Sequence, residues 1–152
     1  MKILVSESDF DPGVEISALH AAQPKVGAVA SFVGLVRDIN EGDRVSTLIL
    51  EHYPAMTEKS LREIVEEAIQ RWSLLDVTVI HRVGKLLPTE RIVFVGVASM
   101  HRGEAFAACE FIMDYLKTQA PFWKKESTPE GERWVESRHS DALAATRWRD
   151  QE

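Results

Sequence analysis

The stretch "RIVFVGVASMHRGEAFAACEFIMDYLKT", Arg91 to Thr118, predicts a strand that leads directly into a buried helix. The strand ends at about Met100 and the helix begins at about Arg102. Apolar side chains occupy most of the helix circumference, namely Ala105, Phe106, Ala108, Cys109, Phe111, Ile112, Met113, Tyr115 and Leu116. A helix that is apolar over so much of its girth is buried on more than one side. In a chain of 152 residues this indicates a subunit interface.

Further elements are expected on both sides of this stretch. The patterns predict strands over residues 2–6, 26–37, 45–53 and 76–87, and helices over residues 15–22 and 57–72. Residues 26–37 are apolar on both faces, which predicts a buried strand, and the polar turn "DINEGDR" makes residues 26–53 a hairpin. Thr57 is the expected N-cap of helix 57–72. The order of elements predicts one α+β domain over residues 1–152, with a mainly antiparallel sheet and two main helices. The sequence does not decide whether the tail after about residue 140 is ordered or flexible.

Composition excludes several classes of protein. The formal net charge is -6, which argues against a nucleic-acid or membrane-surface binder, because both need a positive field. The apolar runs are shorter than the roughly 20 residues of a membrane span, and the N-terminus lacks the pattern of a signal peptide. Cys109 is the single cysteine, so neither an internal disulfide nor an all-cysteine metal site is expected. These features predict a cytoplasmic protein.

Two candidate anion sites lie at element ends. His101 and Arg102 stand at the start of the long helix, where free backbone N–H groups attract anions. Taken alone, this pair is better explained as part of a solvated loop. Arg37 stands where a strand leaves the sheet, and it can bind a phosphate or pair with Asp38 or Asp43. The residues themselves do not decide between these alternatives.

A third cationic segment is "KTQAPFWKKE", Lys117 to Glu126. Lys117 lies at the C-terminal end of the helix, where a cation complements the dipole. The segment continues as a turn with a proline and two aromatic rings, and it sets Lys124 and Lys125 on a rigid support. Adjacent lysines usually face water, yet a lysine that takes part in chemistry needs such a support. The five histidines show no metal-ligand spacing, and Cys109 falls on a core face.

Taken together, the motifs resemble the large, catalytic subunit of molybdopterin synthase. The matching segments are "GAVASFVGLVRDINEGDRV", "LEHYPAMTEK", "VTVIHRVGKL", "VFVGVASMHRGEAFAACEFIMDYLKTQAPFWKKE" and "TPEGERWVE". The resemblance covers roughly Val26 to Arg138 in order and without large gaps. One departure is Ala55, where the family commonly has glycine.

The resemblance implies an α/β hammerhead fold and a sulfurtransferase of molybdenum-cofactor biosynthesis. Family members convert cyclic pyranopterin monophosphate (precursor Z) into molybdopterin by forming its dithiolene. The sulfur comes from a thiocarboxylate on the C-terminal Gly-Gly of a small ubiquitin-like subunit. No metal or further cofactor is implied. The implied assembly is a heterotetramer with a central dimer of large subunits, and neither nucleic acid nor membrane is a partner.

The resemblance also assigns roles to residues. Lys117 and Lys124 become the catalytic candidates, Lys117 for general acid/base work and Lys124 for orienting the partner's tail or the substrate. Glu126 would hold a lysine or a water, and Lys125 would contact substrate or solvent. The implied substrate-binding set is Leu35, Val36, Arg37, His101, Arg102, Lys117, Lys124, Lys125, Glu126 and Arg138.

Helix geometry adds a prediction about assembly. His101 and Lys117 are 16 residues apart on one helix, so about 24 Å separates them at about 1.5 Å per residue. A pterin phosphate is too small to touch both residues. We therefore expect Arg37, Lys117 and Lys124 of one chain to share a site with His101 and Arg102 of a second copy, together with Arg138. Two alternatives to the molybdopterin synthase function remain. One is a non-catalytic module that binds a ubiquitin-like tail, and the other is a different phosphate-handling α+β enzyme.

Overall fold

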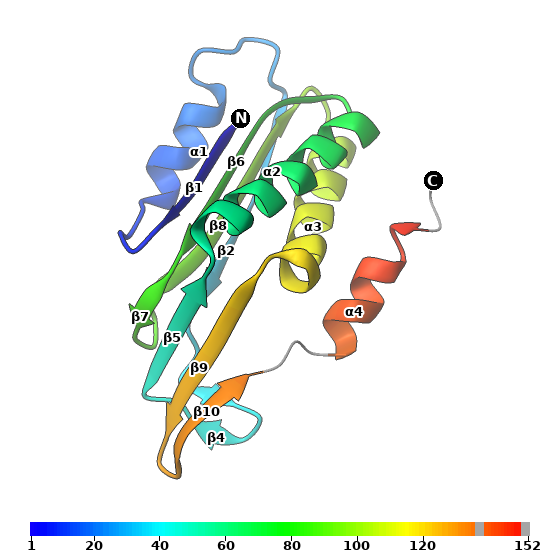
Figure 1. Ribbon diagram of the computed structural model, residues 1–152. Helices are drawn as coiled ribbons and strands as arrows, with labels where there is room; N and C mark the ends of the chain where they lie inside the picture. The colour runs from blue at the N-terminus through cyan, green and yellow to red at the C-terminus, as the bar shows by residue number, and fades with distance from the viewer. Residues whose placement is uncertain (136–138, 150–152) are drawn as a thin grey trace.

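The computed structural model describes residues 1–135 and 139–149. The elements follow in the order β1 (Lys2–Ser6), α1 (Pro12–His20), β2 (Ala28–Leu35), β3 (Ile39–Asn40), β4 (Asp43–Arg44), β5 (Thr47–His52), α2 (Pro54–Arg71), β6 (Leu74–Arg82), β7 (Gly84–Leu86), β8 (Arg91–Ser99), α3 (Arg102–Gln119), β9 (Phe122–Thr128), β10 (Gly131–Val135) and α4 (His139–Thr146). Figure 1 shows the two main helices, α2 and α3, side by side on one face of a sheet, with α1 on the other face. The expected α+β class is confirmed.

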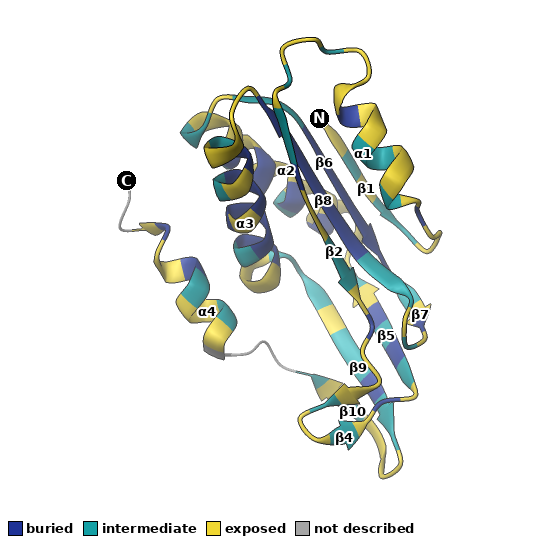
Figure 2. Ribbon diagram, turned by 180° about the vertical axis from the view of Figure 1, so that it is seen from behind, coloured by how far each residue is buried: buried dark blue, intermediate teal, exposed yellow. Residues whose placement is uncertain are grey.

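The first sheet has the strand order β1-β6-β8-β2, with β1 parallel to β6 and the other pairs antiparallel. Its central strands are covered on both faces, as Figure 2 shows in dark blue. Along β8, Val93, Val95 and Val97 belong to the core under α2 and α3, whereas Phe94 and Ala98 belong to the core under α1. This alternation follows from the two-residue period of a strand. It explains why the run is apolar without interruption.

The second sheet is entirely antiparallel, with the order β10-β9-β5-β7. It continues from the lower end of the first sheet in Figure 1. The expected hairpin over residues 26–53 is therefore wrong, because β2 pairs with β8 and β5 pairs with β7 and β9. The chain crosses from one sheet to the other between these strands and forms the short β3–β4 ladder on the way. Burial of residues 26–37 is also incomplete, since β2 is an edge strand and exposes Phe32 and Leu35.

Several element boundaries differ from the sequence-based expectation. The expected strand over residues 76–87 is split, because Gly84 has a φ of +84° and turns the chain from β6 into β7. Helix α2 begins at Pro54 after the cap residue Tyr53, so Thr57 is not its N-cap but lies buried inside the helix. Proline is well suited to a first helical position. Ala55, the departure from the family pattern, lies in this first turn.

The C-terminal part contains elements that the sequence did not predict. The rigid turn expected after α3 is strand β9, and β10 and α4 follow it. Trp148 is buried against Trp72 and Phe111, and its Nε1 donates to Asp114 Oδ2 at 2.7 Å. Its packing ties the residues after α4 to α3. Among the described residues, no helix combines the length and the apolar character that a membrane span requires.

Candidate functional site

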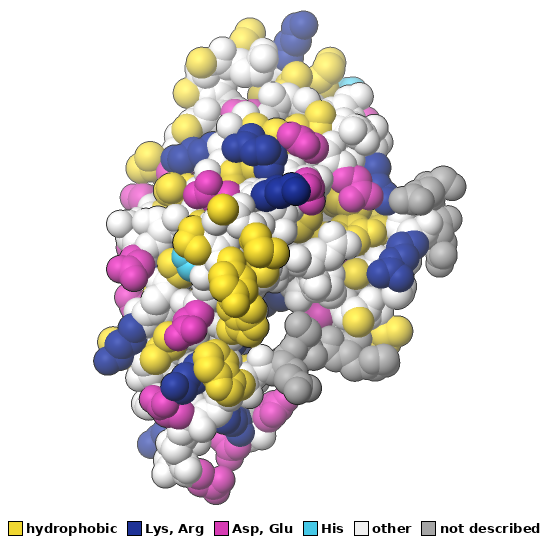
Figure 3. Space-filling view, viewed as in Figure 1, with side chains coloured by type: hydrophobic (Ala, Val, Ile, Leu, Met, Phe, Trp, Pro, Cys, Tyr) yellow, Lys and Arg dark blue, Asp and Glu magenta, His cyan; other side chains and the backbone are white. Residues whose placement is uncertain are grey.

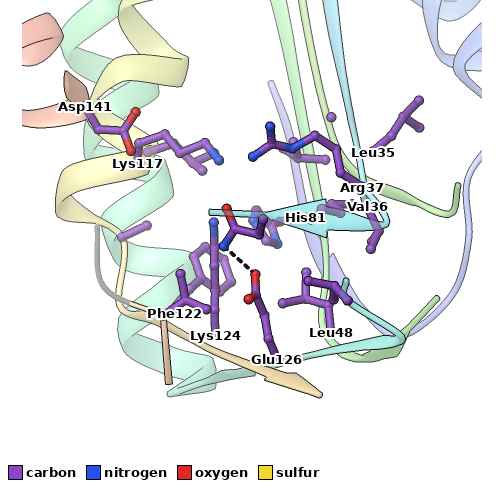
Figure 4. Close-up of a pocket in the computed structure, with 18 of the residues that line it drawn as sticks. Leu35, Val36, Arg37, Leu48, His81, Lys117, Phe122, Lys124, Glu126 and Asp141 are labelled. Carbon is purple, nitrogen blue, oxygen red and sulfur yellow. Dashed lines mark hydrogen bonds between the residues drawn. The ribbon is translucent and has the colours of Figure 1, made fainter. Parts of the chain in front are cut away.

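A cavity of about 520 Å³ lies where the two sheets meet the C-terminal end of α3. Its walls come mainly from the end of β2 with the residues after it, the last turns of α3 and strand β9, and residues of β3, β5, β6, β8, β10 and α4 complete the lining. Figure 4 shows the side chains that line it. A volume of this size is typical of a small-molecule site. The cavity therefore marks the candidate functional site.

Strand β9 directs alternate side chains into and away from the cavity. Phe122, Lys124 and Glu126 line it, as the two-residue period of a strand requires. Lys125 does not line it, since its Nζ pairs with Glu132 Oε2 at 2.9 Å and lies 5.5 Å from the centre of the Trp134 ring. The structure thus separates two adjacent lysines that the sequence treated together. Lys125 lies outside the site.

Three cationic side chains from three different elements reach the cavity. Arg37 follows β2, Lys117 comes from the last turns of α3, and Lys124 comes from β9. Figure 4 shows the ends of Arg37 and Lys117 directed toward each other across the cavity. Leu35 and Val36 also line the wall, as expected. A positive cavity in a chain of net charge -6 is an arrangement suited to an anionic ligand.

Glu126 is the buried carboxylate of the cavity wall. Its Oε1 accepts a hydrogen bond from Asn40 Nδ2 at 2.7 Å, drawn dashed in Figure 4, and its Oε2 accepts from the Arg133 guanidinium at 3.2 Å. Arg133 also pairs with Asp43 at 2.6 Å. Glu126 therefore links β9 to β10 and to the β3–β4 ladder. The expected contact of Glu126 with substrate stays a prediction.

His81, at the end of β6, also lines the cavity. Its ring stacks on Phe122 with centroids 3.8 Å apart, and its Nδ1 lies 2.7 Å from the Arg82 carbonyl oxygen. Because a carbonyl only accepts, Nδ1 carries the proton and donates it to this bond. Burial, together with the smaller effect of the nearby Lys124 and Lys117, lowers the pKa of His81 to about 3, although the bond to the Arg82 carbonyl acts in the opposite direction. The imidazole is therefore neutral near pH 7, with an unprotonated Nε2.

The chain is similar to known proteins of one family. The family model described as MoaE protein matches residues 5–119. The chain belongs to the MoaE protein family. The molybdopterin synthase catalytic subunit of Ralstonia nicotianae is 65% identical over 146 residues, covering 96% of this chain and 83% of the relative.

Two solved structures have folds similar to that of this chain. The molybdopterin biosynthesis MoaE protein of Burkholderia ambifaria has a TM-score of 0.83 and 55% identity, with 97% of each chain covered. A complex of subunits 1 and 2 of the molybdopterin-converting factor from Helicobacter pylori contains a chain with a TM-score of 0.71 and 20% identity, with 90% of each chain covered. At that identity the second likeness supports the fold alone.

Two of the remaining predicted residues of this chain lie away from the cavity. His101 is the N-cap residue of α3 and Arg102 begins the helix, so both stand at the end opposite to Lys117. Neither lines the cavity. Arg138 lies outside the described residues. The expectation that a second copy supplies His101 and Arg102 stays a prediction.

Sequence reasoning missed His81, Phe122 and Asn40 as members of the site. The polar histidine inside the apolar run "VTVIHRVG" is a signal of a buried polar group, which metal-ligand spacing does not detect. Asn40 could not be found from its spacing, since its partner Glu126 is 86 residues away. Among the described residues, no three His, Cys, Asp or Glu side chains gather as a metal site.

Proposed function

We propose that this chain is the catalytic subunit of a molybdopterin synthase. It converts cyclic pyranopterin monophosphate into molybdopterin in the cytoplasm, with sulfur from the C-terminal thiocarboxylate of a small ubiquitin-like subunit and without a metal or further cofactor. The observation that carries the proposal is the convergence of Arg37, Lys117 and Lys124 on one cavity of about 520 Å³. The family membership and the 65% identity to a named catalytic subunit support it.

The charges of the reactants suit this cavity. The substrate brings a phosphate and the partner brings an anionic thiocarboxylate, whereas Arg37, Lys117 and Lys124 are cations. The thiocarboxylate sulfur attacks a pterin side-chain carbon that bears oxygen; the carbon–oxygen bond breaks, the oxygen leaves with a proton, and a thioester link to the partner forms. Water then cleaves the acyl carbon–sulfur bond, which leaves the sulfur on the pterin and releases the partner as a carboxylate. Two such transfers, each from one thiocarboxylate, supply the two sulfurs of the dithiolene. Lys117 stabilises negative charge or transfers a proton in these steps, and Lys124 orients the partner's tail.

The proposed assembly contains two kinds of contact. A small sulfur-carrier subunit inserts its C-terminal tail into the cavity of each chain, in line with the two-subunit complex known from H. pylori. Two copies of this chain form the centre of a heterotetramer. In that dimer His101 and Arg102 of one copy complete the site of the other, because α3 holds them far from Lys117 of their own chain. Arg138 joins the same phosphate-binding group.

Reconstitution from purified components tests this function. The chain is incubated with cyclic pyranopterin monophosphate and a thiocarboxylated small subunit, and molybdopterin is measured. The matched control is the same small subunit with an ordinary C-terminal carboxylate, which must give no product. If the chain binds the thiocarboxylated tail but forms no molybdopterin, the non-catalytic tail-binding module is the correct function instead.

A further inference from the structure

The charged side chains that line the cavity in the described part of the chain are three cations, Arg37, Lys117 and Lys124, and two carboxylates, Glu126 and Asp141. Arg37, Lys117 and Lys124 can only donate when charged. Both oxygens of Glu126 already accept bonds, from Asn40 and from Arg133. A pterin ring, in contrast, carries N–H groups that need acceptors as well as atoms that accept. The three cations suit the phosphate, whereas the N–H groups of the ring need an acceptor whose lone pair is open to the cavity.

We propose that Nε2 of His81 is the acceptor that orients the pterin ring, by receiving a hydrogen bond from one of its N–H groups. The proposal rests on the proposed function for the identity of the ligand. It makes His81 a substrate-binding residue that confers specificity for a nitrogen heterocycle. The phosphate is recognised separately, by the cations.

The contacts of His81 fix the direction and the protonation of Nε2. The bond from Nδ1 to the Arg82 carbonyl leaves the lone pair on Nε2, and the Phe122 ring prevents rotation of the imidazole. Within the described part of the chain, Nε2 has no hydrogen-bond partner. The buried side-chain nitrogen and oxygen atoms that lack a partner there are His52 Nδ1 and Thr57 Oγ1, so Nε2 is not completely buried. Nε2 is therefore accessible from the cavity that His81 lines. The low pKa of His81 keeps this atom an acceptor rather than a base at neutral pH.

A purely structural role would be packing of the His81 ring against Phe122. The variant His81→Phe keeps a flat ring for this stack and removes the acceptor, whereas His81→Gln offers a side-chain oxygen in its place. The matched control is His52→Phe, since His52 lies on Phe122 with ring centroids 6.4 Å apart but does not line the cavity. Thermal unfolding of each variant shows whether it is folded.

Two ligands separate the acceptor role from general damage to the cavity. We expect His81→Phe to weaken binding of cyclic pyranopterin monophosphate about tenfold to a hundredfold, because an N–H group of the bound ring loses its partner. Binding of inorganic phosphate should stay within about twofold, because the cations that attract it are intact. His52→Phe should leave both affinities unchanged, and His81→Gln should recover part of the pterin affinity.

A spectroscopic measurement on the unmodified protein gives an independent answer. The ¹⁵N resonance of His81 Nε2, assigned by its absence in His81→Phe, should shift when cyclic pyranopterin monophosphate binds and stay in place with inorganic phosphate. Equal pterin affinity of wild type and His81→Phe, equal loss of both ligands, or an unmoved Nε2 resonance in the pterin complex would overturn the proposal. If the wild type makes molybdopterin in any of these cases, the proposed function stands and only the role of His81 fails. If the wild type neither binds the pterin nor makes molybdopterin, both fail.

Discussion

At the scale of single residues, His81 combines burial with a cationic neighbourhood. The folded protein keeps its imidazole neutral, with a pKa of about 3, through burial and the charges of Lys124, Lys117 and His52. In the unfolded chain the same ring titrates near its ordinary value of about 6.5. Proton binding by this one residue is therefore different in the two states over a broad range of pH.

The difference predicts a loss of stability in acid. Between about pH 6.5 and pH 3 the unfolded state binds more protons at residue 81, so the free energy of unfolding rises with pH. On acidification His81 should lower that free energy by up to about 1.4 kcal/mol per pH unit. Urea unfolding of wild type and His81→Phe, measured between neutral pH and about pH 4, isolates this contribution.

Subtraction of the two curves removes the effect of the carboxylates, such as Asp9, whose pKa is lowered mainly by its hydrogen bond from Arg91. Identical slopes for wild type and His81→Phe would show that His81 takes up its proton in the folded protein as easily as in the unfolded chain.

Several single residues of the candidate site could be predicted from the sequence. Arg37, Lys117, Lys124 and Glu126 were expected and all line one cavity. Lys125 was expected to contact substrate or solvent, on a segment that was expected to be a turn. The segment is instead a strand, whose period of two sends Lys125 to the other face.

At the scale of elements, the Glu126 carboxylate links three strands. It joins β9 to Arg133 of β10 and to Asn40 of β3, and the Glu126 side chain is only 8% exposed. Removing one partner from such a group leaves the other with an unsatisfied charge. The second sheet depends on this cluster at the edge of the cavity.

We predict that Glu126→Ala lowers the free energy of unfolding by about 1–3 kcal/mol, the cost of losing hydrogen bonds to charged groups. Arg133→Ala should cost less, because the Arg133 side chain is 32% exposed. The double variant should be less destabilised than the sum of the two, by about 0.5 kcal/mol or more. Urea unfolding of the four proteins measures this coupling, and strict additivity would show that the pair contributes no coupling energy.

The elements show which parts of a fold local patterns can predict. Helix α3 was expected at residues 102–118 and spans Arg102–Gln119. The prediction was accurate because the apolar pattern around the helix circumference is a property of the local sequence. The pairing of β2 with β8 was not predicted, because the apolar pattern of a strand does not identify the strand with which it pairs. The break between β6 and β7 depends on the positive φ of Gly84. Glycine can adopt a positive φ, but its presence in a sequence does not show that it does so.

At the scale of the whole molecule, charged side chains of both signs are scattered over the surface. Figure 3 shows them around an apolar group that covers the start of α2 and the neighbouring part of β9. The exposed apolar residues of this region include Tyr53, Met56 and Trp123, and the rings of Tyr53 and Trp123 meet edge to face at 4.6 Å. The cavity lies on the other face of β9, where Lys124 points inward.

The length of α3 gives a prediction for the assembled enzyme. A Lys117→Ala chain and a His101→Ala chain should each be inactive alone, because every site lacks one required group. In a random mixture, half of the dimers contain both chains and each such dimer has one intact site, so about a quarter of the wild-type sites should return. Molybdopterin formation by the mixture is the measurement. No recovery would show that Lys117 and His101 of one chain do not serve sites shared between copies.

On the proposed function, sulfur transfer takes place in the cavity that Lys124 faces and Lys125 does not. This location can be tested by a single-turnover measurement of molybdopterin formation, with wild type, Lys124→Ala and Lys125→Ala and saturating thiocarboxylated partner. Lys124→Ala should lower the rate by about 10²–10⁴-fold, the contribution of a positioned catalytic side chain. Lys125→Ala should stay within about twofold of wild type, since it loses a surface ion pair with Glu132 and a contact with the Trp134 ring, both outside the cavity. A wild-type rate for Lys124→Ala, or an equal loss for both variants, would contradict the claim.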